Sequence, residues 1–212
     1  MAGHVSQVFE NIGDHAFYGC AALQTLNLPE GFGKATPSIW EGQTSIEALL
    51  SRITIGQRAF ANTGLTSLTL PSTLQSIGSG AFYGCSDLKT INFAQLDLER
   101  GLAILDEAFA ESGVTSLAFP MSPNGPIAIT SRAFQLCDDL TEVTFQLPNP
   151  WNEDWKNLVI WGALPGHPTA GAFAKCEALV VVSFGNSACY PPASVDVRTG
   201  AFEDSLVSVA EC

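Results

Sequence analysis

Charged residues are scarce in this chain of 212 residues: they make up 14% of the sequence, against roughly 25% in an ordinary globular domain. Basic residues are the rarest, with 9 Lys and Arg against 21 Asp and Glu, and no basic run occurs. The formal net charge of -12 would repel a phosphate backbone, so we expect no nucleic-acid partner. Anionic membrane surfaces are disfavoured for the same reason.

Long hydrophobic runs and an export leader are also missing. No apolar stretch approaches the ~20 residues that a bilayer-spanning helix needs, although the hydrophobic content of 46% is ample for a buried core. The first residues, Met1 to Val5, lack the basic and apolar segments of a secretory signal. We therefore expect either a protein that stays inside the cell or one whose leader was removed, and the compartment stays open.

Patterns that carry catalysis or bind metal are absent as well. His4, His15 and His167 have no Ser, Cys or carboxylate partner at a recognisable spacing, and no phosphate-binding loop occurs. The acidic pair Asp138-Asp139 falls in an expected turn, where a solvated role is favoured over calcium binding. We predict that the chain is not an enzyme and needs no cofactor or metal.

What the sequence does contain is a set of seven similar units, each opened by an Ala-Phe pair, at Ala16-Phe17, Ala59-Phe60, Ala81-Phe82, Ala108-Phe109, Ala133-Phe134, Ala172-Phe173 and Ala201-Phe202. Four positions before the Ala stands an aliphatic residue, namely Ile12, Ile55, Ile77, Ile104, Ile129 or Val197, with Pro168 as the exception. After the Phe comes a Leu-x-x-Leu-x-Leu pattern. Its alternating end is typical of a short strand with one buried face.

The spacing of the units indicates a solenoid. Successive repeat Phe residues are 43, 22, 27, 25, 39 and 29 residues apart, so the basic period is 22 to 25 residues and the larger gaps hold insertions. Leucine-rich repeats have periods of about 20 to 29 residues, whereas helical repeats need about 33 or more. We predict a strand-dominated α/β chain that forms one right-handed leucine-rich-repeat solenoid over residues 1–212, with about seven coils. A parallel sheet lines its concave face, the returns are short irregular or 3-10 segments, and insertions lie near residues 30–54 and 146–168.

The repeat resembles a known family. The segment Ile77-Gly78-Ser79-Gly80-Ala81-Phe82-Tyr83-Gly84-Cys85 and the stretch from Leu23 to Pro29 look like the BspA-type leucine-rich repeat. The shorter unit from Ala59 to Leu68 is similar to the same family. This resemblance implies a surface protein of bacteria or protists that binds host or matrix proteins.

A column of small side chains stands three residues after the repeat Phe, filled by Cys20, Thr63, Cys85, Ser112, Cys137, Cys176 and Ser205. A position that accepts Cys, Thr and Ser is typical of a small packed side chain, and the lack of Cys-x-x-Cys spacing argues against zinc. Cys189 and Cys212 stand outside this column and could pair or stay free.

Two units are one residue shorter between the Phe and the next aliphatic residue. In these units Gly64 and Gly113 follow the small residue of the column. We expect both glycines to turn the backbone through positive φ, where one residue fewer is available.

Strand residues between the buried aliphatics are expected to face solvent in two columns. One column contains Thr25, Ser67, Thr90, Ser116, Glu142, Val181 and Ser208, and the next contains Asn27, Thr69, Asn92, Ala118, Thr144, Ser183 and Ala210. Such small side chains suit an exposed strand, and they also suit a flat face for an extended protein partner. Both interpretations stay open, and the candidate contacts are Thr25, Asn27, Thr90, Asn92, Glu142 and Thr144.

Tryptophan is concentrated in the second insertion, where Trp151, Trp155 and Trp161 lie between Gln146 and Pro168. Trp is enriched at the centres of protein interfaces, so these residues are candidate partner contacts. Alternatively, the rings cover the convex side of the solenoid or fill a gap between units. Trp40 lies in the first insertion, where the spacing of Ile46, Leu49, Leu50 and Ile53 suits a short amphipathic helix.

These observations favour a non-catalytic protein-interaction or structural subunit whose partners are proteins, including a larger multisubunit assembly. The alternative is a secreted or cell-surface adhesin that binds host or matrix proteins. Because solenoids need polar caps, we also expect at least one end to dock against another subunit, another domain or a second copy.

Overall fold

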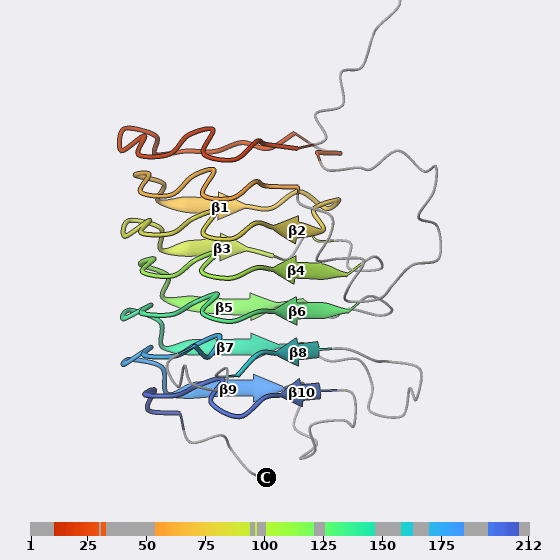
Figure 1. Ribbon diagram of the computed structural model, residues 1–212, viewed down its shortest axis with the longest axis vertical. Coiled ribbons are helices and arrows are strands. Elements are labelled where there is room, and N and C mark those ends of the chain that lie inside the picture. Colours follow the sequence, from red (N-terminus) through yellow and green to blue (C-terminus); the bar gives the residue numbers. More distant parts are fainter. Residues whose placement is uncertain are drawn as a thin grey trace, which may run out of the picture.

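In the computed structural model the chain forms a series of coils stacked one on the next (Figure 1). The structure describes residues 11–29, 31–32, 54–93, 96, 101–120, 126–146, 158–162, 170–184 and 195–207. These residues form parallel strands joined by turns, and no helix occurs among them. The predicted strand-dominated solenoid is confirmed, whereas the helix expected around Ile46 to Ile53 lies outside the described residues.

One sheet, which we call the odd sheet, contains the strands that sequence analysis predicted. Its strand order is β1-β3-β5-β7-β9, all parallel, with β1 (Ser67–Thr69), β3 (Thr90–Asn92), β5 (Ser116–Phe119), β7 (Glu142–Phe145) and β9 (Val181–Phe184). Leu68, Leu117 and Val143 point inward and are buried, while their neighbours along each strand are exposed, or half-buried in the case of Thr144. This alternation is what the period-two pattern predicted.

A second parallel sheet, which we call the even sheet, was not predicted. It contains β2 (Ser76–Ile77), β4 (Leu102–Ile104), β6 (Ile127–Ile129), β8 (Leu158–Ile160) and β10 (Val195–Val197) in the order β10-β8-β6-β4-β2. The strands β4, β6 and β8 are buried at all three residues, which explains their uninterrupted apolar sequences. Isolated parallel bridges join Ile12 to Ile55 and Ile55 to Ile77, so the same alignment continues into the first coils.

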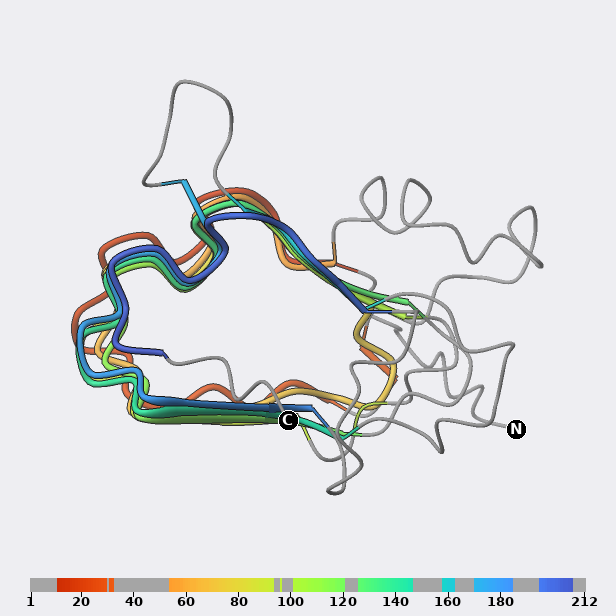
Figure 2. The ribbon, with the colours of Figure 1, turned by 90° about the horizontal axis from the view of Figure 1, so that it is seen from below.

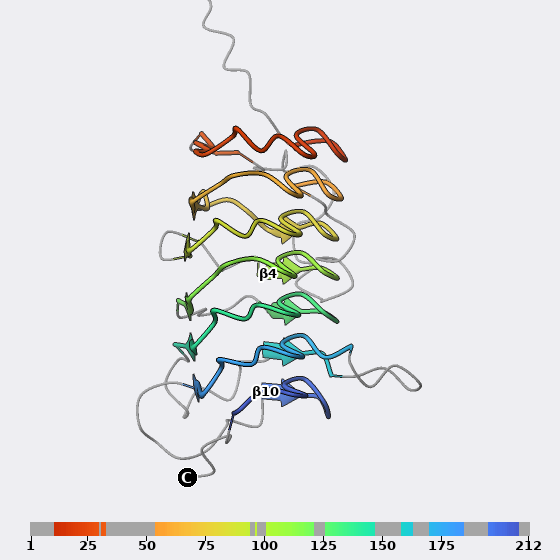
Figure 3. The same ribbon diagram turned by 90° about the vertical axis from the view of Figure 1, so that its left-hand side faces the viewer.

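The Ala-Phe turn links the two sheets in each coil, and successive turns lie directly over one another (Figures 2 and 3). The repeat Phe rings stack through the array in the order Phe17, Phe60, Phe82, Phe109, Phe134, Phe173 and Phe202, with centroids 5.1 to 5.3 Å apart. A second stack beneath the odd sheet consists of Phe93, Phe119, Phe145 and Phe184. The two stacks and the inward Leu, Ile and Val residues form one core.

From Ala59 onward the alanine of each pair is buried, and its carbonyl accepts a hydrogen bond from the repeat Phe amide of the coil before. Phe60 N donates to Ala81 O at 2.8 Å, and Phe109 N donates to Ala133 O at 2.7 Å. Two positions of the turn adopt positive φ in most units: the residue before the Ala and the residue two positions after the Phe. Neither position requires glycine, since Arg58 (50°) and Asn62 (57°) occupy them in the second unit.

The expectation for Gly64 and Gly113 was wrong, because neither residue adopts positive φ. A β-carbon on Gly64 would overlap the carbonyl oxygen of Ala21, and one on Gly113 would overlap that of Ser86. In both short units the coil therefore runs too close to the backbone of the coil before it for any side chain. The positive φ falls instead on Asn62 and Glu111.

The sixth unit is also corrected. Residues counted back from Ala172 gave Pro168 as the exception to the aliphatic column, but Ile160 of β8 pairs with Ile129 and Val197 and occupies that column. The extra residues stand between β8 and Ala172. The strand β8, which ends one residue before Trp161, thus lies within the range 146–168 that sequence analysis described as an insertion.

Candidate protein-interaction surface

The two sheets present different outer faces. Along the odd sheet the outward residues of β1, β3 and β5 are all exposed: Ser67, Thr69, Thr90, Asn92, Ser116 and Ala118. In the even sheet the aligned residues Ser76, Ala103, Ala128 and Val159 are buried although they alternate with inward neighbours, and exposure returns at Asp196 in the edge strand β10. Of the two described faces, the odd sheet is therefore the one that is open to a partner.

This open face is flat and chemically uniform because parallel register aligns its residues across the strands. Ser67 lies opposite Thr90, which lies opposite Ser116, and Thr144 lies opposite Ser183. The hydroxyl of Ser183 donates to Oγ1 of Thr144 at 3.2 Å. Hydroxyl groups of this kind can both donate and accept, so the face can hydrogen-bond to an extended polar surface.

Near the far edge of the sheet the chemistry changes. Glu142 is exposed and accepts a hydrogen bond from the Thr144 hydroxyl at 3.3 Å. It is the one charged side chain among the outward residues of the described odd-sheet strands. Val181, in the next strand, is an exposed aliphatic residue and continues the column. The face is therefore neutral over β1, β3 and β5, with one carboxylate and one apolar group beyond.

The candidate contacts Thr25 and Asn27 precede this sheet. Both are exposed, but no strand is formed there; the first coil is tied to the second by the amide of Thr66, which donates to Gln24 O at 3.2 Å. Of the predicted contacts, the structure thus aligns Thr90, Asn92, Glu142 and Thr144 on one face, with Thr25 and Asn27 one coil earlier. Ser208 and Ala210 lie outside the described residues.

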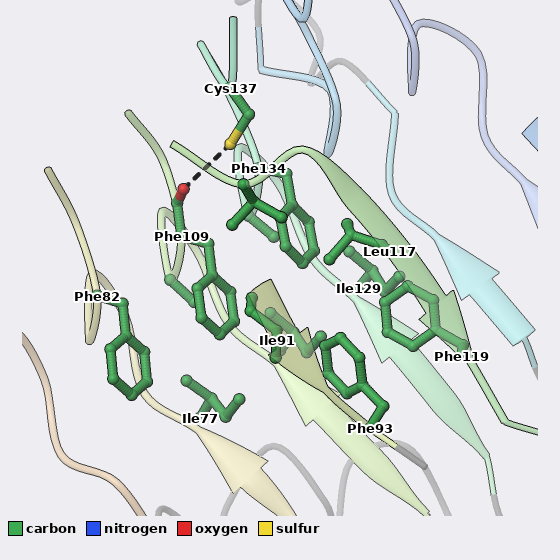
Figure 4. Close-up of a cluster of buried hydrophobic side chains, with 14 of the residues drawn as sticks. Ile77, Phe82, Ile91, Phe93, Phe109, Leu117, Phe119, Ile129, Phe134 and Cys137 are labelled. Carbon is green, nitrogen blue, oxygen red and sulfur yellow. Dashed lines mark hydrogen bonds between the residues drawn. The ribbon is translucent and has the colours of Figure 1, made fainter. Parts of the chain in front are cut away.

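The cysteine column belongs to the core and not to this surface. Each buried thiol donates to the carbonyl of the repeat Phe one coil earlier, as Cys137 does to Phe109 at 3.2 Å (Figure 4). Burial raises the pKa of Cys85, and the neighbouring Cys137 thiol together with burial raises the pKa of Cys176. Cys20, Cys85, Cys137 and Cys176 are free thiols, whereas Cys189 and Cys212 lie outside the described residues.

Sequence analysis missed a cluster of charged residues along the Ala-Phe turns. Arg132 pairs with Asp106 at 2.6 Å and with Glu107 at 3.2 Å, and Glu107 also lies 3.7 Å from Arg58. Arg58 covers the ring of Tyr83 at 5.4 Å from the centroid. These groups are partly exposed, so each pair contributes at most about 1 kcal/mol. The only sequence signal for this cluster was a charged residue directly before the repeat Ala. That position is charged in some units, as at Arg58, Glu107 and Arg132, but not in all, so the sequence shows no regular pattern.

Trp161 is the one candidate tryptophan within the described residues. It follows β8, in the even sheet, and its ring packs beneath the guanidinium of Arg198 at 4.8 Å from the centroid. Its indole nitrogen is buried and has no hydrogen-bond partner among the described residues. Trp161 is therefore partly packed, and it follows a strand of the even sheet, away from the exposed columns of the odd sheet. Trp40, Trp151 and Trp155 lie outside the described residues.

In the described ranges of the chain, no group of three or more His, Cys, Asp or Glu side chains is placed to hold a metal ion. Likewise, among the described residues there is no helix of the length and apolarity needed to cross a membrane.

The fold is a leucine-rich-repeat solenoid. Its parallel strands follow one another coil by coil, and small and aliphatic side chains fill the space between the Phe stacks. The sequence model of the BspA type leucine rich repeat region matches residues 4–50 and 53–150 in 6 copies, and the chain belongs to this family. Beyond the matched residues, Phe173 and Phe202 continue the same ring stack.

A crystal structure of a leucine-rich repeat protein from Bacteroides ovatus ATCC 8483 is similar to this chain at 15% identity. The similarity covers 93% of this chain and 72% of that chain, with a TM-score of 0.25. Among curated proteins, none matches this sequence. Membership of the repeat family indicates a protein-interaction or structural role, and such repeats are typically non-catalytic.

Proposed function

We propose that this chain is a non-catalytic protein-binding subunit that uses the outer face of the odd sheet to hold an extended protein partner. The observation that carries the proposal is the contrast between the two sheets. The outward residues of β1, β3 and β5 in the odd sheet are exposed, whereas their counterparts in β2, β4, β6 and β8 of the even sheet are buried.

The composition of the face defines the kind of partner. Ser67, Thr69, Thr90 and Ser116 offer short hydroxyl groups at a strand spacing of about 4.8 Å, which suits hydrogen bonding to an extended polypeptide. Charge contributes little there, because Glu142 is the one ionised outward residue of the described strands. We infer that shape and hydrogen bonding, and not electrostatic attraction, hold the partner.

The insertions extend this proposed surface. Trp40, Trp151 and Trp155 are candidate anchors, since Trp dominates many protein interfaces. Trp161 is assigned a lesser role because its ring already packs against Arg198. The partner is proposed to be part of a larger assembly, and the chain to act as one solenoid over residues 1–212.

The test introduces bulk and charge into the face. A Thr90→Arg/Ser116→Arg variant is compared with an Ala22→Arg/Ser86→Arg variant, whose exposed neutral positions lie on the turns. Partners recovered from native extracts with the parent chain are identified by mass spectrometry, and their affinities for purified variants are then measured. We expect the face variant to lose at least about tenfold in affinity and the control to bind normally. Equal binding by both variants would reject the odd sheet as the binding surface.

A second experiment addresses the insertions. The Trp151→Ala/Trp155→Ala variant and the Trp40→Ala variant are measured against the same partner, with Trp161→Phe as the packing control. A loss confined to the first two variants supports a role of the insertions in binding. Unchanged affinity with intact folding removes them from the proposed surface.

A second candidate function is a secreted or cell-surface adhesin that binds host or matrix proteins. Family membership is the observation that favours it. Antibody labelling of intact cells distinguishes the two functions: surface labelling supports the adhesin, and recovery in an intracellular complex without surface labelling supports the structural subunit.

A further inference from the structure

The Ala-Phe turns give the array a direction, because the amides at alternate positions around each repeat Phe donate to carbonyls of the following coil. In the second coil three amides donate to the third: Arg58 N to Ser79 O at 2.9 Å, Phe60 N to Ala81 O at 2.8 Å and Asn62 N to Tyr83 O at 2.8 Å. The equivalent amides of Gly80, Phe82 and Gly84 donate onward to the fourth coil at 2.7 to 2.9 Å. Each coil therefore presents acceptors to the coil before it and donors to the coil after it.

The first described coil has acceptor carbonyls, and the last has donor amides, that no neighbouring described coil pairs with. In the first coil the acceptor positions are the carbonyls of Asp14, Ala16 and Tyr18, and within the described residues no amide donates to them. In the last coil the donor positions are the amides of Gly200, Phe202 and Asp204, and the described part of the chain supplies them no acceptor. Three donors at one face thus have the spacing of three acceptors at the other.

Apolar groups accompany these backbone groups at both faces. Phe17, the first ring of the stack, is 41% exposed, whereas Phe60 and Phe82 behind it are fully buried. In the last coil Leu206 is 71% exposed, and its neighbour Val207, which stands where Leu65 and Val114 are fully buried, is only partly buried. An unpaired backbone edge beside exposed apolar groups favours association with another chain.

We propose that a second copy of this chain stacks head to tail on the first, so that the last described coil of one copy meets the first described coil of the other. The amides of Gly200, Phe202 and Asp204 would donate to the carbonyls of Asp14, Ala16 and Tyr18, and the Phe202 ring would stack on Phe17. Val207, flanked by the exposed Leu206, would then cover Leu23, and both Val207 and Leu23 are only partly buried in the single chain. This contact is independent of the odd-sheet face proposed above.

A second copy fits better than an unrelated chain because the contact repeats one already made six times. Ring separations stay between 5.1 and 5.3 Å along the whole stack, so the geometry is the same whichever coils are adjacent. An interface between two different surfaces leaves one free surface at each end of the dimer, so further copies add until a ring closes or a filament forms. Association is therefore expected to pass beyond the dimer as concentration rises.

The test blocks each face separately in the full chain. Phe17→Arg blocks the head, Leu206→Arg blocks the tail, and Leu136→Arg is the matched control, since Leu136 is an exposed aliphatic residue in the middle of the array. Sedimentation velocity is recorded over a concentration series for each variant and for an equal mixture of the two blocked variants. Circular dichroism checks that each variant unfolds cooperatively, and Phe17→Ser with Leu206→Ser replaces any Arg variant that does not.

Head-to-tail stacking predicts a specific oligomeric state for each sample. The parent chain and Leu136→Arg form species larger than a dimer, each blocked variant alone stays monomeric, and their mixture forms a heterodimer that grows no further. Three results would overturn the proposal: a parent chain that is monomeric at every concentration, a blocked variant that dimerises alone, or a mixture that stays monomeric.

Discussion

The thiol of Cys137 donates a hydrogen bond to the carbonyl oxygen of Phe109, one coil earlier, at 3.2 Å. The same bond joins Cys85 to Phe60 at 3.1 Å and Cys176 to Phe134 at 3.0 Å. In the short units a hydroxyl turns back to its own coil instead, as Thr63 does to Phe60 at 2.9 Å. The column thus fills space and satisfies the Phe carbonyl, which explains why Cys, Thr and Ser replace one another.

Thiol reactivity should separate the buried cysteines from the exposed one. In a Cys189→Ser/Cys212→Ser background we expect Cys20 to be alkylated at least about 100-fold faster than Cys137 or Cys176, because burial limits access to both buried thiols and the raised pKa of Cys176 also disfavours its thiolate. Mass spectrometry after timed alkylation measures the rates, and denatured protein is the control in which all four react. Equal rates in the folded chain would contradict the packing described here.

Position 113 should require glycine, because the backbone of the preceding coil lies too close for a side chain. Gly113→Ala places a β-carbon against the Ser86 carbonyl, and we expect a loss of about 1 to 3 kcal/mol in the free energy of unfolding. Gly13→Ala is the matched control, since no atom lies within 4 Å of its added β-carbon and a change within about 0.5 kcal/mol is expected. Urea unfolding measures both, and similar losses would show that the coils separate easily.

The repeat Phe stack should be most sensitive in its middle. Phe109→Ala removes a fully buried ring between two stacked neighbours, and we expect it to cost about 3 to 5 kcal/mol. Phe17→Ala removes a ring with one open side, so about 1 kcal/mol is expected. Urea unfolding of dilute protein makes the comparison without contributions from association. A larger cost at Phe17 than at Phe109 would be inconsistent with this core.

Tyr83 should make stability depend on pH in the alkaline range. Its hydroxyl donates to the Glu111 carboxylate, and this hydrogen bond, with burial, raises the pKa of Tyr83 from 10.0 to about 12. Because the folded-state pKa is raised, the stabilisation is complete below pH 10 and is lost as the pH rises from about 10 through 12. Absorbance titration of the folded chain against Tyr83→Phe follows the phenol directly.

The Tyr83→Phe variant also supplies the stability control. Its free energy of unfolding should fall less steeply than that of the parent chain between pH 10 and 12. Parallel curves for the two chains, or a Tyr83 phenol that ionises near pH 10, would show that the Glu111 contact does not persist in solution.

Sequence alone predicted the part of the fold that repeats with a visible period. The odd sheet was found because Leu68, Leu117 and Val143 alternate with polar residues. The even sheet was missed because runs such as Leu102-Ala103-Ile104 are short, buried on both sides and without alternation. Gly64 and Gly113 were misinterpreted because their role depends on a neighbouring coil, which local turn preferences do not reveal.

The candidate surface was only partly predictable for a different reason. Exposure of Thr90 and Asn92 follows from strand alternation, whereas the burial of Ala103 and Ala128 depends on what covers the even sheet. Trp161 was grouped with Trp151 and Trp155 by proximity in sequence, yet pairing of β8 in the even sheet sets it apart. The partner-binding roles of these residues stay predictions.

The array keeps its register on either side of extra sequence. Residues between Phe145 and Leu158, and between Gly162 and Ala170, interrupt the sixth unit, but Ile129 still pairs with Ile160 and the Phe134 and Phe173 rings are 5.1 Å apart, as elsewhere. These two junctions are therefore natural cloning sites. A foreign peptide or a small folded tag spliced there should be displayed without unfolding the scaffold, and the family can diversify at the same junctions by gaining sequence rather than by changing its core.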